Sequence, residues 1–95
     1  MALTATATNS NIELNTSAFQ TVLAANANRQ YVCLCVHDFN DVDIFWGAAG
    51  SAVDSTGICI PGGGNFHFSI IDLPYTGEIS AKAIKGNPLL YILEI

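Results

Sequence analysis

Residues 30–37 read QYVCLCVH, and this stretch decides the fold class. Positions 32, 34 and 36 hold Val, Leu and Val, whereas positions 31, 33 and 35 hold Tyr, Cys and Cys. This period of two is typical of a β-strand, in which successive side chains project to opposite faces of the sheet. Because apolar side chains occupy both sets of positions, we expect both faces of the strand to be at least half buried.

Turn residues on either side of this stretch divide the chain into further short strands. Residues 26–29 read as a turn before it. Asp38, Asn40 and Asp41 form a turn after it, and the alternating segment 42–47 that follows predicts a β-hairpin. Pro61 and the next three glycines end a later strand, because Pro lacks a ladder donor and Gly accepts positive φ. The other segments with a strand pattern are 12–14, 17–25, 57–60, 66–71, 78–84 and 89–95.

Seven or eight short strands at regular spacing, without a convincing helix, predict an all-β fold. The segment 17–25 fits helix or strand by its pattern, and its strand neighbours favour strand. We expect one small β-sandwich or barrel over residues 12–95, jelly-roll-like or Greek-key, because 95 residues suffice for a single core. Residues 2–11 are almost wholly Ala, Thr, Asn and Ser, so we expect residues 1–11 to form a flexible N-terminal arm.

Charged residues are scarce in this chain. They make up 12 % of it, whereas 51 % of the residues are hydrophobic, and a typical domain has about 25 % charged residues. We therefore expect exposed apolar surface that contacts another chain; the alternative is that Ser, Thr, Asn and Gly cover the surface. A net charge of −5, with Arg29, Lys82 and Lys85 as the cations, excludes a nucleic-acid partner, because phosphate neutralisation needs clustered cations.

Targeting signals and disulfides are also not expected. No stretch approaches the roughly 20 apolar residues of a membrane helix, and residues 1–11 have neither the cationic start nor the apolar run of a signal peptide. We expect no membrane partner and a protein that stays in the cytoplasm where it is made. Cys33, Cys35 and Cys59 fit this compartment as small apolar side chains in reduced form.

Residues suited to catalysis or to metal binding are few. His37 and His67 lie in separate strands and could meet near Cys35 or Asp38, yet the closely spaced ligand pairs of zinc sites do not occur here. We expect each histidine at an exposed or rim position. The sequence therefore predicts no enzyme, no catalytic residue, no metal site and no cofactor.

Two loops bear a partial likeness to ligand-binding loops. Residues 38–43, DFNDVD, place oxygen ligands at alternate positions as a calcium loop does, but a valine occupies one ligand position and the expected glycine is missing. We interpret this run as a solvated turn, with weak divalent-ion binding left open. Residues 61–65, PGGGN, are not followed by the Lys, Ser or Thr of a phosphate loop, and we interpret them as a flexible turn.

Aromatic residues are the remaining candidates for a contact surface. Trp46, Phe66 and Tyr75 could form a platform for a sugar or another ligand. The period of two at Phe66 and Phe68 fits strand packing or an oligomer interface better. We therefore predict a set of interface residues: Phe19, Tyr31, Phe45, Trp46, Phe66, Phe68 and Tyr75.

Five short motifs follow one another in this chain: ANANRQY at 25–31, VDI at 42–44 with a glycine at 47, GICIP at 57–61, LPYTGEISA at 73–81, and ILE at 92–94. In this order they resemble small virion proteins of tailed bacteriophages. That group includes capsid decoration, or cement, proteins and parts of head fibres. The likeness covers about residues 20–94.

The resemblance implies a β-sandwich subunit on the virion. Such a subunit binds the major capsid protein at the outer surface of the head as a homodimer or homotrimer and clamps neighbouring shell subunits. Repeated weak contacts suffice for this, because the second contact is effectively intramolecular. Fibre members of the group carry an extended extra segment, which is not seen here, so a compact cap is favoured. A head-fibre or tail adaptor and a small glycan-binding β-sandwich are the alternatives.

Overall fold

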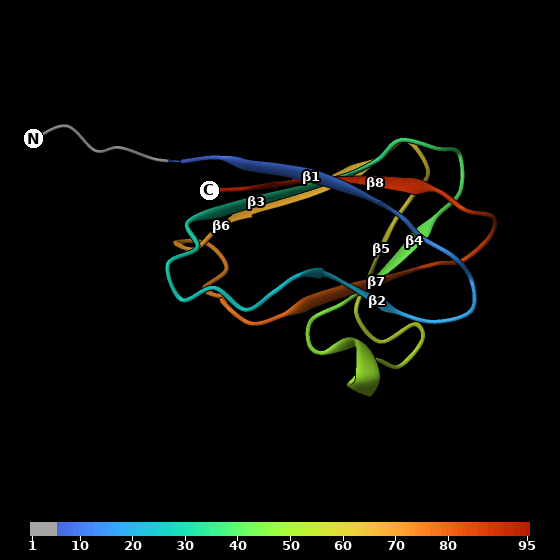
Figure 1. The fold of residues 1–95 in the computed structure, drawn as a ribbon, viewed down its shortest axis with the longest axis horizontal. Helices are drawn as coiled ribbons and strands as arrows, with labels where there is room; N and C mark the ends of the chain where they lie inside the picture. The colour runs from blue at the N-terminus through green and yellow to red at the C-terminus, as the bar shows by residue number, and fades with distance from the viewer. Residues whose placement is uncertain (1–5) are drawn as a thin grey trace, which may run out of the picture.

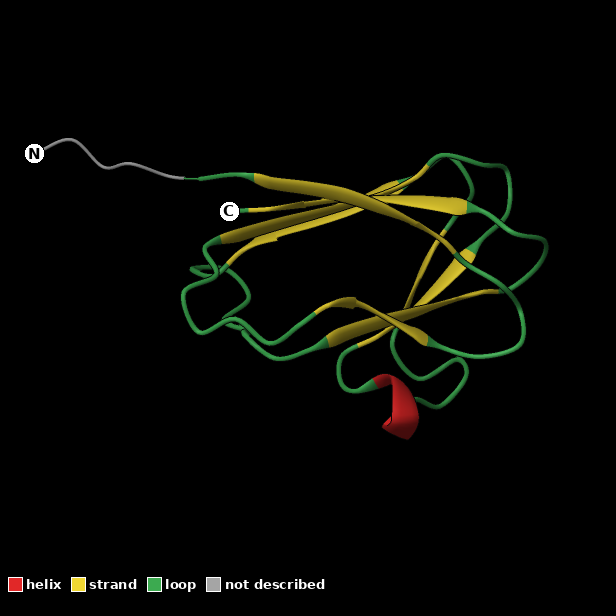
Figure 2. Ribbon diagram, in the orientation of Figure 1, coloured by secondary structure: helices red, strands yellow, loops and turns green. Residues whose placement is uncertain are grey.

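Eight strands form two four-stranded antiparallel sheets in the computed structural model, which describes residues 6–95 (Figures 1 and 2). One short 3-10 helix, η1, accompanies them. The elements are β1 (Thr8–Glu13), β2 (Gln20–Leu23), β3 (Tyr31–Val36), β4 (Val42–Phe45), η1 (Ala49–Ser51), β5 (Ile58–Ile60), β6 (Asn65–Ser69), β7 (Ile79–Ala83) and β8 (Leu89–Glu94).

The strand order is that of a jelly roll. Sheet 1 has the order β1-β8-β3-β6 and sheet 2 the order β2-β7-β4-β5. The two sheets lie one above the other in Figure 1, and most connections pass from one sheet to the other. Two Greek keys wound in this way define the jelly roll. The predicted all-β sandwich is therefore confirmed, and the jelly-roll alternative is the one that the chain adopts.

The predicted hairpin between β3 and β4 is wrong. β3 pairs with β8 and β6 in sheet 1, whereas β4 pairs with β7 and β5 in sheet 2. Residues 37–41 carry the chain across from one sheet to the other. Alternation along a strand indicates which face of the strand is buried. It contains no information about which other strand pairs with it. The polar turn was therefore recognised correctly but its partner strands were not.

The first strand begins earlier than its sequence pattern predicts. β1 starts at Thr8 and pairs with β8 along its whole length, from Thr8 opposite Glu94 to Glu13 opposite Leu89. The expected arm is thus wrong for residues 8–11, which form backbone hydrogen bonds although their side chains are polar and exposed. The edge of β8 supplies these bonds, and no apolar periodicity accompanies them. Residues 1–5 of the expected arm lie outside the described residues.

The core lies between the two sheets and consists of the inward positions of the strands. Val32, Leu34 and Val36 of β3 are at most 1 % exposed, as their alternation predicts. They face the inward side chains of sheet 2, among them Ile44 and Ile79, which are both 0 % exposed. Full burial of one such aliphatic side chain contributes about 1.5–3 kcal/mol. The described residues contain no helix that is long and apolar enough to cross a membrane.

Candidate interaction surfaces

Four of the seven predicted interface aromatics pack against one another. They come from β6, from the start of the β4–β5 connection and from the β6–β7 connection. The Trp46 ring lies edge-on to Phe66, Phe68 and Tyr75, with ring centroids 5.6–5.8 Å apart. The cluster extends the core, since Phe68 is buried and the other three rings are half buried against it. Edge-to-face contacts of this kind are favourable for aromatic rings. The rings that could have formed a ligand platform, the alternative to strand packing, are thus engaged in packing within the chain.

The other three predicted aromatics lie apart from this cluster. Phe19 contacts Phe45 with ring centroids 6.2 Å apart, and the Lys82 ammonium lies 5.6 Å from the centre of the Phe19 ring. Tyr31 lies on the outer face of sheet 1, where its ring is 6.2 Å from that of His67. All three aromatics are half buried. The seven residues therefore form three separate groups, and their part in an interface stays a prediction.

The histidines and the acidic side chains of residues 38–43 do not form a common site. His37 and His67 are both exposed, as expected. Within residues 6–95, no group of three or more His, Cys, Asp or Glu side chains is arranged to hold a metal ion. The acidic side chains of the 38–43 run instead accept backbone hydrogen bonds: Asp38 from the N–H of residue 39 at 2.6 Å, Asp41 from residue 62 at 2.9 Å and Asp43 from residue 55 at 3.0 Å.

The three cysteines are free thiols, as expected. Cys33 and Cys35 are half buried on the outer side of β3, and Cys59 is exposed on β5. Burial raises the pKa of the Cys33 thiol above its ordinary value, and the neighbouring Cys35 adds to the effect. Although Cys59 is exposed, partial desolvation of its thiol raises its pKa, with further contributions from the carboxylates of Asp41 and Asp43. Cys33 and Cys59 are therefore neutral near pH 7 and are weak nucleophiles.

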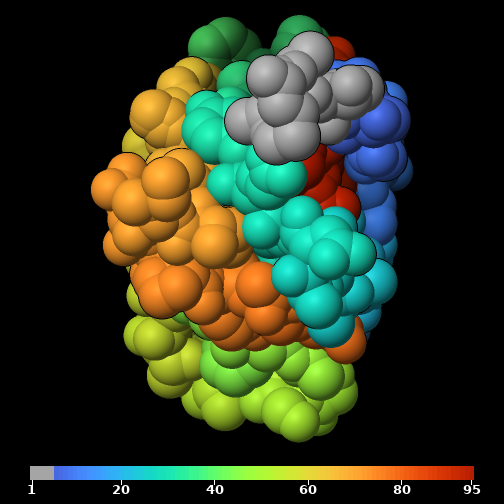
Figure 3. All heavy atoms as spheres, turned by 90° about the vertical axis from the view of Figure 1, so that its left-hand side faces the viewer, coloured from blue at the N-terminus to red at the C-terminus, as the bar shows by residue number. Residues whose placement is uncertain are grey.

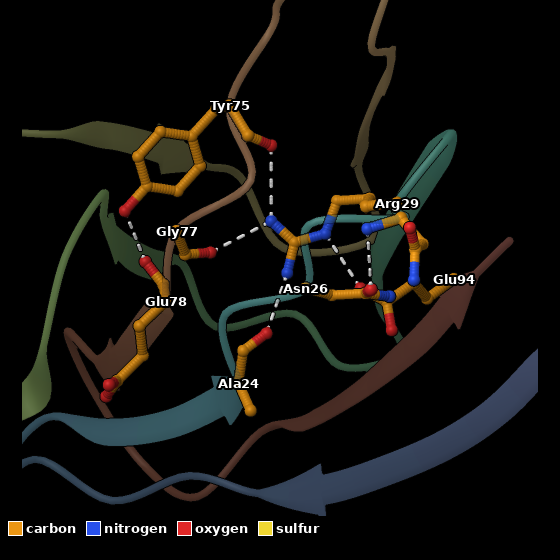
Figure 4. Close-up of polar contacts among 8 residues, drawn as sticks. Ala24, Asn26, Arg29, Tyr75, Gly77, Glu78 and Glu94 are labelled. Carbon is orange, nitrogen blue, oxygen red and sulfur yellow. Dashed lines mark hydrogen bonds and ion pairs between the residues drawn. The ribbon is translucent and has the colours of Figure 1, made fainter.

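A buried ion pair closes the end of the sandwich formed by the β2–β3 and β6–β7 connections (Figure 4). The Arg29 side chain is 0 % exposed, and its Nε donates to a Glu94 carboxylate oxygen at 2.7 Å. Nη1 donates to the carbonyls of Tyr75 and Gly77, and Nη2 donates to that of Ala24. The sequence places Arg29 in a turn and among the cations, and it does not predict that the side chain is buried. The signal that could have found it is that Arg29 is the single arginine of a charge-poor chain, two residues before β3.

The β4–β5 connection, residues 46–57, covers part of the outer face of sheet 2. Four polar contacts hold this segment on the sheet: Ser80 Oγ to the Gly47 carbonyl, the Ala49 N–H to Glu78, the Ser55 N–H to Asp43, and Lys82 to Asp54. An open hollow of ≈ 320 Å³ lies beside it. The charged groups that line the hollow already form these contacts. The hollow therefore results from the way the loop is attached to the sheet.

The outer face of sheet 1 has a different character. Its side chains come from alternate positions of the four strands, and they are mostly apolar or uncharged polar. Tyr91, which is 41 % exposed, lies near its centre. Glu13 is the one acidic side chain on this face among the described strand residues. The outward residues are Asn9, Asn11, Glu13, Tyr31, Cys33, Cys35, Asn65, His67, Ser69, Leu89, Tyr91 and Leu93.

Large apolar side chains are exposed at both ends of the sandwich. At one end, Phe39 is 97 % exposed in the β3–β4 connection and Ile84 is 54 % exposed in the β7–β8 connection. At the other end, Ile71 and Leu73 are 93 % and 37 % exposed in the β6–β7 connection. Figure 1 shows these ends on the right and the left, and Figure 3 looks onto the second, where residues of the β6–β7 connection (orange) project. These exposed loop residues are not predicted by the sequence, because loops have no periodicity.

Comparison of the chain with protein-family models, with curated proteins and with solved structures finds no match.

Proposed function

We propose that this chain is a structural virion protein, a capsid decoration protein that binds the outer surface of a phage head as a homo-oligomer and stabilises the shell. The observation that carries the proposal is the exposure of Phe39 and Ile71, 97 % and 93 %, at opposite ends of a sandwich with a closed core. Large exposed apolar patches mark contacts with other chains, and each end carries two exposed apolar side chains, Phe39 with Ile84 and Ile71 with Leu73. Two such sites at opposite ends allow one subunit to bridge two neighbours.

The outer face of sheet 1 supports contact between copies of the chain. Each copy has a net charge of −5, so two copies repel unless they meet through a surface that is poor in acids. This face carries Glu13 at one corner, whereas Tyr91 and Leu93 lie on its apolar part. Four strands about 4.8 Å apart, with about six residues of roughly 3.3 Å each, give a planar area on the order of 400 Å².

That area sets the strength of the self-contact. A stable interface of standard size removes about 800 Å² from each partner. The contact between copies is therefore weak by itself, and simultaneous binding to the shell reinforces it by raising the effective concentration of each copy beside the next. A protein that occupies many equivalent positions on a particle meets this requirement.

The buried polar side chains favour a structural role over catalysis. Arg29, Asp43 and Ser80 are each at most 7 % exposed, and all three form hydrogen bonds that attach loops to the sheets. The aromatic side chains of the alternative glycan site are also engaged, because Trp46 contacts three other rings. These groups stabilise the framework, and the exposed loop residues are left for recognition.

Electron microscopy of heads assembled without this chain tests the proposal. Addition of the purified protein should produce ordered density at many equivalent positions on the outer surface and should raise the temperature at which the shell disassembles. Heads that already carry the protein serve as the control, since their sites are occupied. Density at a single vertex or at the tail would indicate an adaptor instead. Absence of added density would contradict the proposal.

A further inference from the structure

The β3–β4 loop, residues 37–41, is held rigidly with an exposed Phe39 at its centre. The Phe39 N–H donates to Asp38 Oδ1 at 2.6 Å, the Gly62 N–H donates to Asp41 Oδ1 at 2.9 Å, and the Ile84 N–H donates to the Asp41 carbonyl at 3.1 Å. The backbones of the two neighbouring loops also touch, because a Cβ at Gly62 would lie 2.1 Å from the Phe39 carbonyl oxygen. Two other connections therefore fix the position of this loop.

The rigidity of this loop has a consequence for binding. An aromatic side chain that is 97 % exposed makes almost no contact within the chain, so packing does not account for its position. A preorganised loop loses little conformational entropy when it binds, and aromatic anchors that fill a pocket dominate the affinity of many interfaces. Ile84, 54 % exposed on an adjoining loop, adds apolar surface at the same end.

The charges around Phe39 define the kind of partner. Carboxylates at positions 38 and 41 flank it, so a complementary surface carries cations around an apolar pocket. A second copy of the chain offers few such cations: Arg29 is buried in an ion pair and Lys82 is bound to an acidic side chain, which leaves Lys85, exposed in the β7–β8 connection at the Phe39 end itself. In a two-fold contact between two copies of this end, that single lysine would face two carboxylates. A different protein with several cations around its pocket is therefore the better match for this end.

We propose that Phe39 anchors this chain to the shell protein by entering an apolar pocket with a rim of Lys or Arg side chains. The inference rests on the proposed function and deepens it, because it assigns one end of the sandwich to the shell. Contacts between copies then use other surfaces, with the outer face of sheet 1 as the candidate.

Binding of purified variants to heads assembled without the chain, followed by sedimentation, tests the anchor. Phe39→Ala should weaken binding by on the order of tenfold or more, since a whole aromatic side chain is lost from the contact. Val53→Ala is the matched control: Val53 is 57 % exposed in the β4–β5 connection, a different loop from those that carry Phe39 and Ile84. Both variants should unfold at the wild-type temperature, because neither side chain belongs to the core.

Two further variants separate the loop's position from its charge. Gly62→Ala keeps the phenyl ring but displaces the Phe39 backbone, so it should also weaken binding, whereas Gly50→Ala, with nothing within 4 Å, should not. Replacing Asp38 and Asp41 together by Asn keeps oxygen acceptors for the loop hydrogen bonds and removes two charges. This double variant should bind several-fold more weakly at low salt and should show a smaller dependence on salt than the wild type.

The outcomes distinguish the inference from the function. If the wild-type protein binds the heads and Phe39→Ala binds them equally well, Phe39 is not the anchor, and the decoration role still stands. Unchanged binding by the Asn double variant would overturn the basic rim. If Phe39→Ala loses self-association, as seen by sedimentation of the free protein, this end forms contacts between copies of the chain. That result would overturn the inference that its partner is a different protein. If the wild-type protein binds no heads, both proposals fail.

Discussion

Arg29 and Glu94 form an ion pair with a distance of 2.7 Å between Nε and the carboxylate oxygen, across 65 residues of sequence. The pair connects the turn before β3 with the last residue of β8. The other two guanidinium nitrogens of Arg29 bind carbonyls of the β2–β3 and β6–β7 connections. One buried side chain therefore attaches two loops and a strand end to each other (Figure 4).

Replacement of Arg29 by Met should destabilise the protein by about 3–5 kcal/mol, because the carboxylate of Glu94 and three carbonyls lose their donor in a desolvated place. Urea unfolding followed by fluorescence of Trp46, the single tryptophan, measures the change. Lys85→Met is the control, since it removes an exposed cation. A decrease in the free energy of unfolding of less than about 1 kcal/mol, the range of surface ion pairs, would contradict the role of Arg29 in holding the two loops and the strand end together.

Two glycines with positive φ provide a second comparison. Gly86 has φ +68° and Gly63 has φ +76°. Alanine at either position should cost about 1–2 kcal/mol, because the left-handed region is unfavourable for a residue with a Cβ. Gly86→Ala should cost more, since its Cβ would lie 2.5 Å from the amide nitrogen of Asn40, whereas the space around Gly63 is open. Equal losses in thermal unfolding would show that Asn40 moves aside freely.

Alkylation of Cys59 tests the effect of its neighbours on the thiol. Only the thiolate reacts with iodoacetamide, and burial together with Asp41 and Asp43 raises the pKa of Cys59. At any pH near neutrality the folded protein should therefore react more slowly at this site than the unfolded protein does. Asp41→Asn should shift the rate profile to lower pH, as read by mass spectrometry of the modified peptide. An unshifted profile would exclude a contribution from that carboxylate.

Charge on the outer face of sheet 1 should disrupt the contact between copies. Tyr91→Glu places an acid near the centre of this face, where two copies would hold like charges close together. Self-association of the concentrated protein, measured by analytical ultracentrifugation, should fall. Val53→Glu adds the same charge elsewhere and should leave self-association unchanged beyond the effect of net charge. An equal response to both variants would place the contact on another surface.

The local pattern of the sequence was sufficient for the β-sandwich but not for its surfaces. Alternation placed Val32, Leu34 and Val36 in the core, and turn residues separated most of the strands at nearly the correct positions, because both signals depend on neighbouring residues. The aromatic residues were recognised as a group, yet Trp46 is the centre of a packed cluster, since rings from three different segments meet there only after folding.

Sequence by itself therefore determined an all-β chain, the inward side of its strands and its shortage of charge. Tertiary structure alone decided that β3 and β4 lie in different sheets, that the polar residues of β1 extend sheet 1, that Arg29 is buried, and that Phe39 is exposed. The physical reason is range. Periodicity and turn chemistry act over a few residues, whereas strand partners, buried ion pairs and exposed loop side chains depend on segments that the folded chain brings together from far apart.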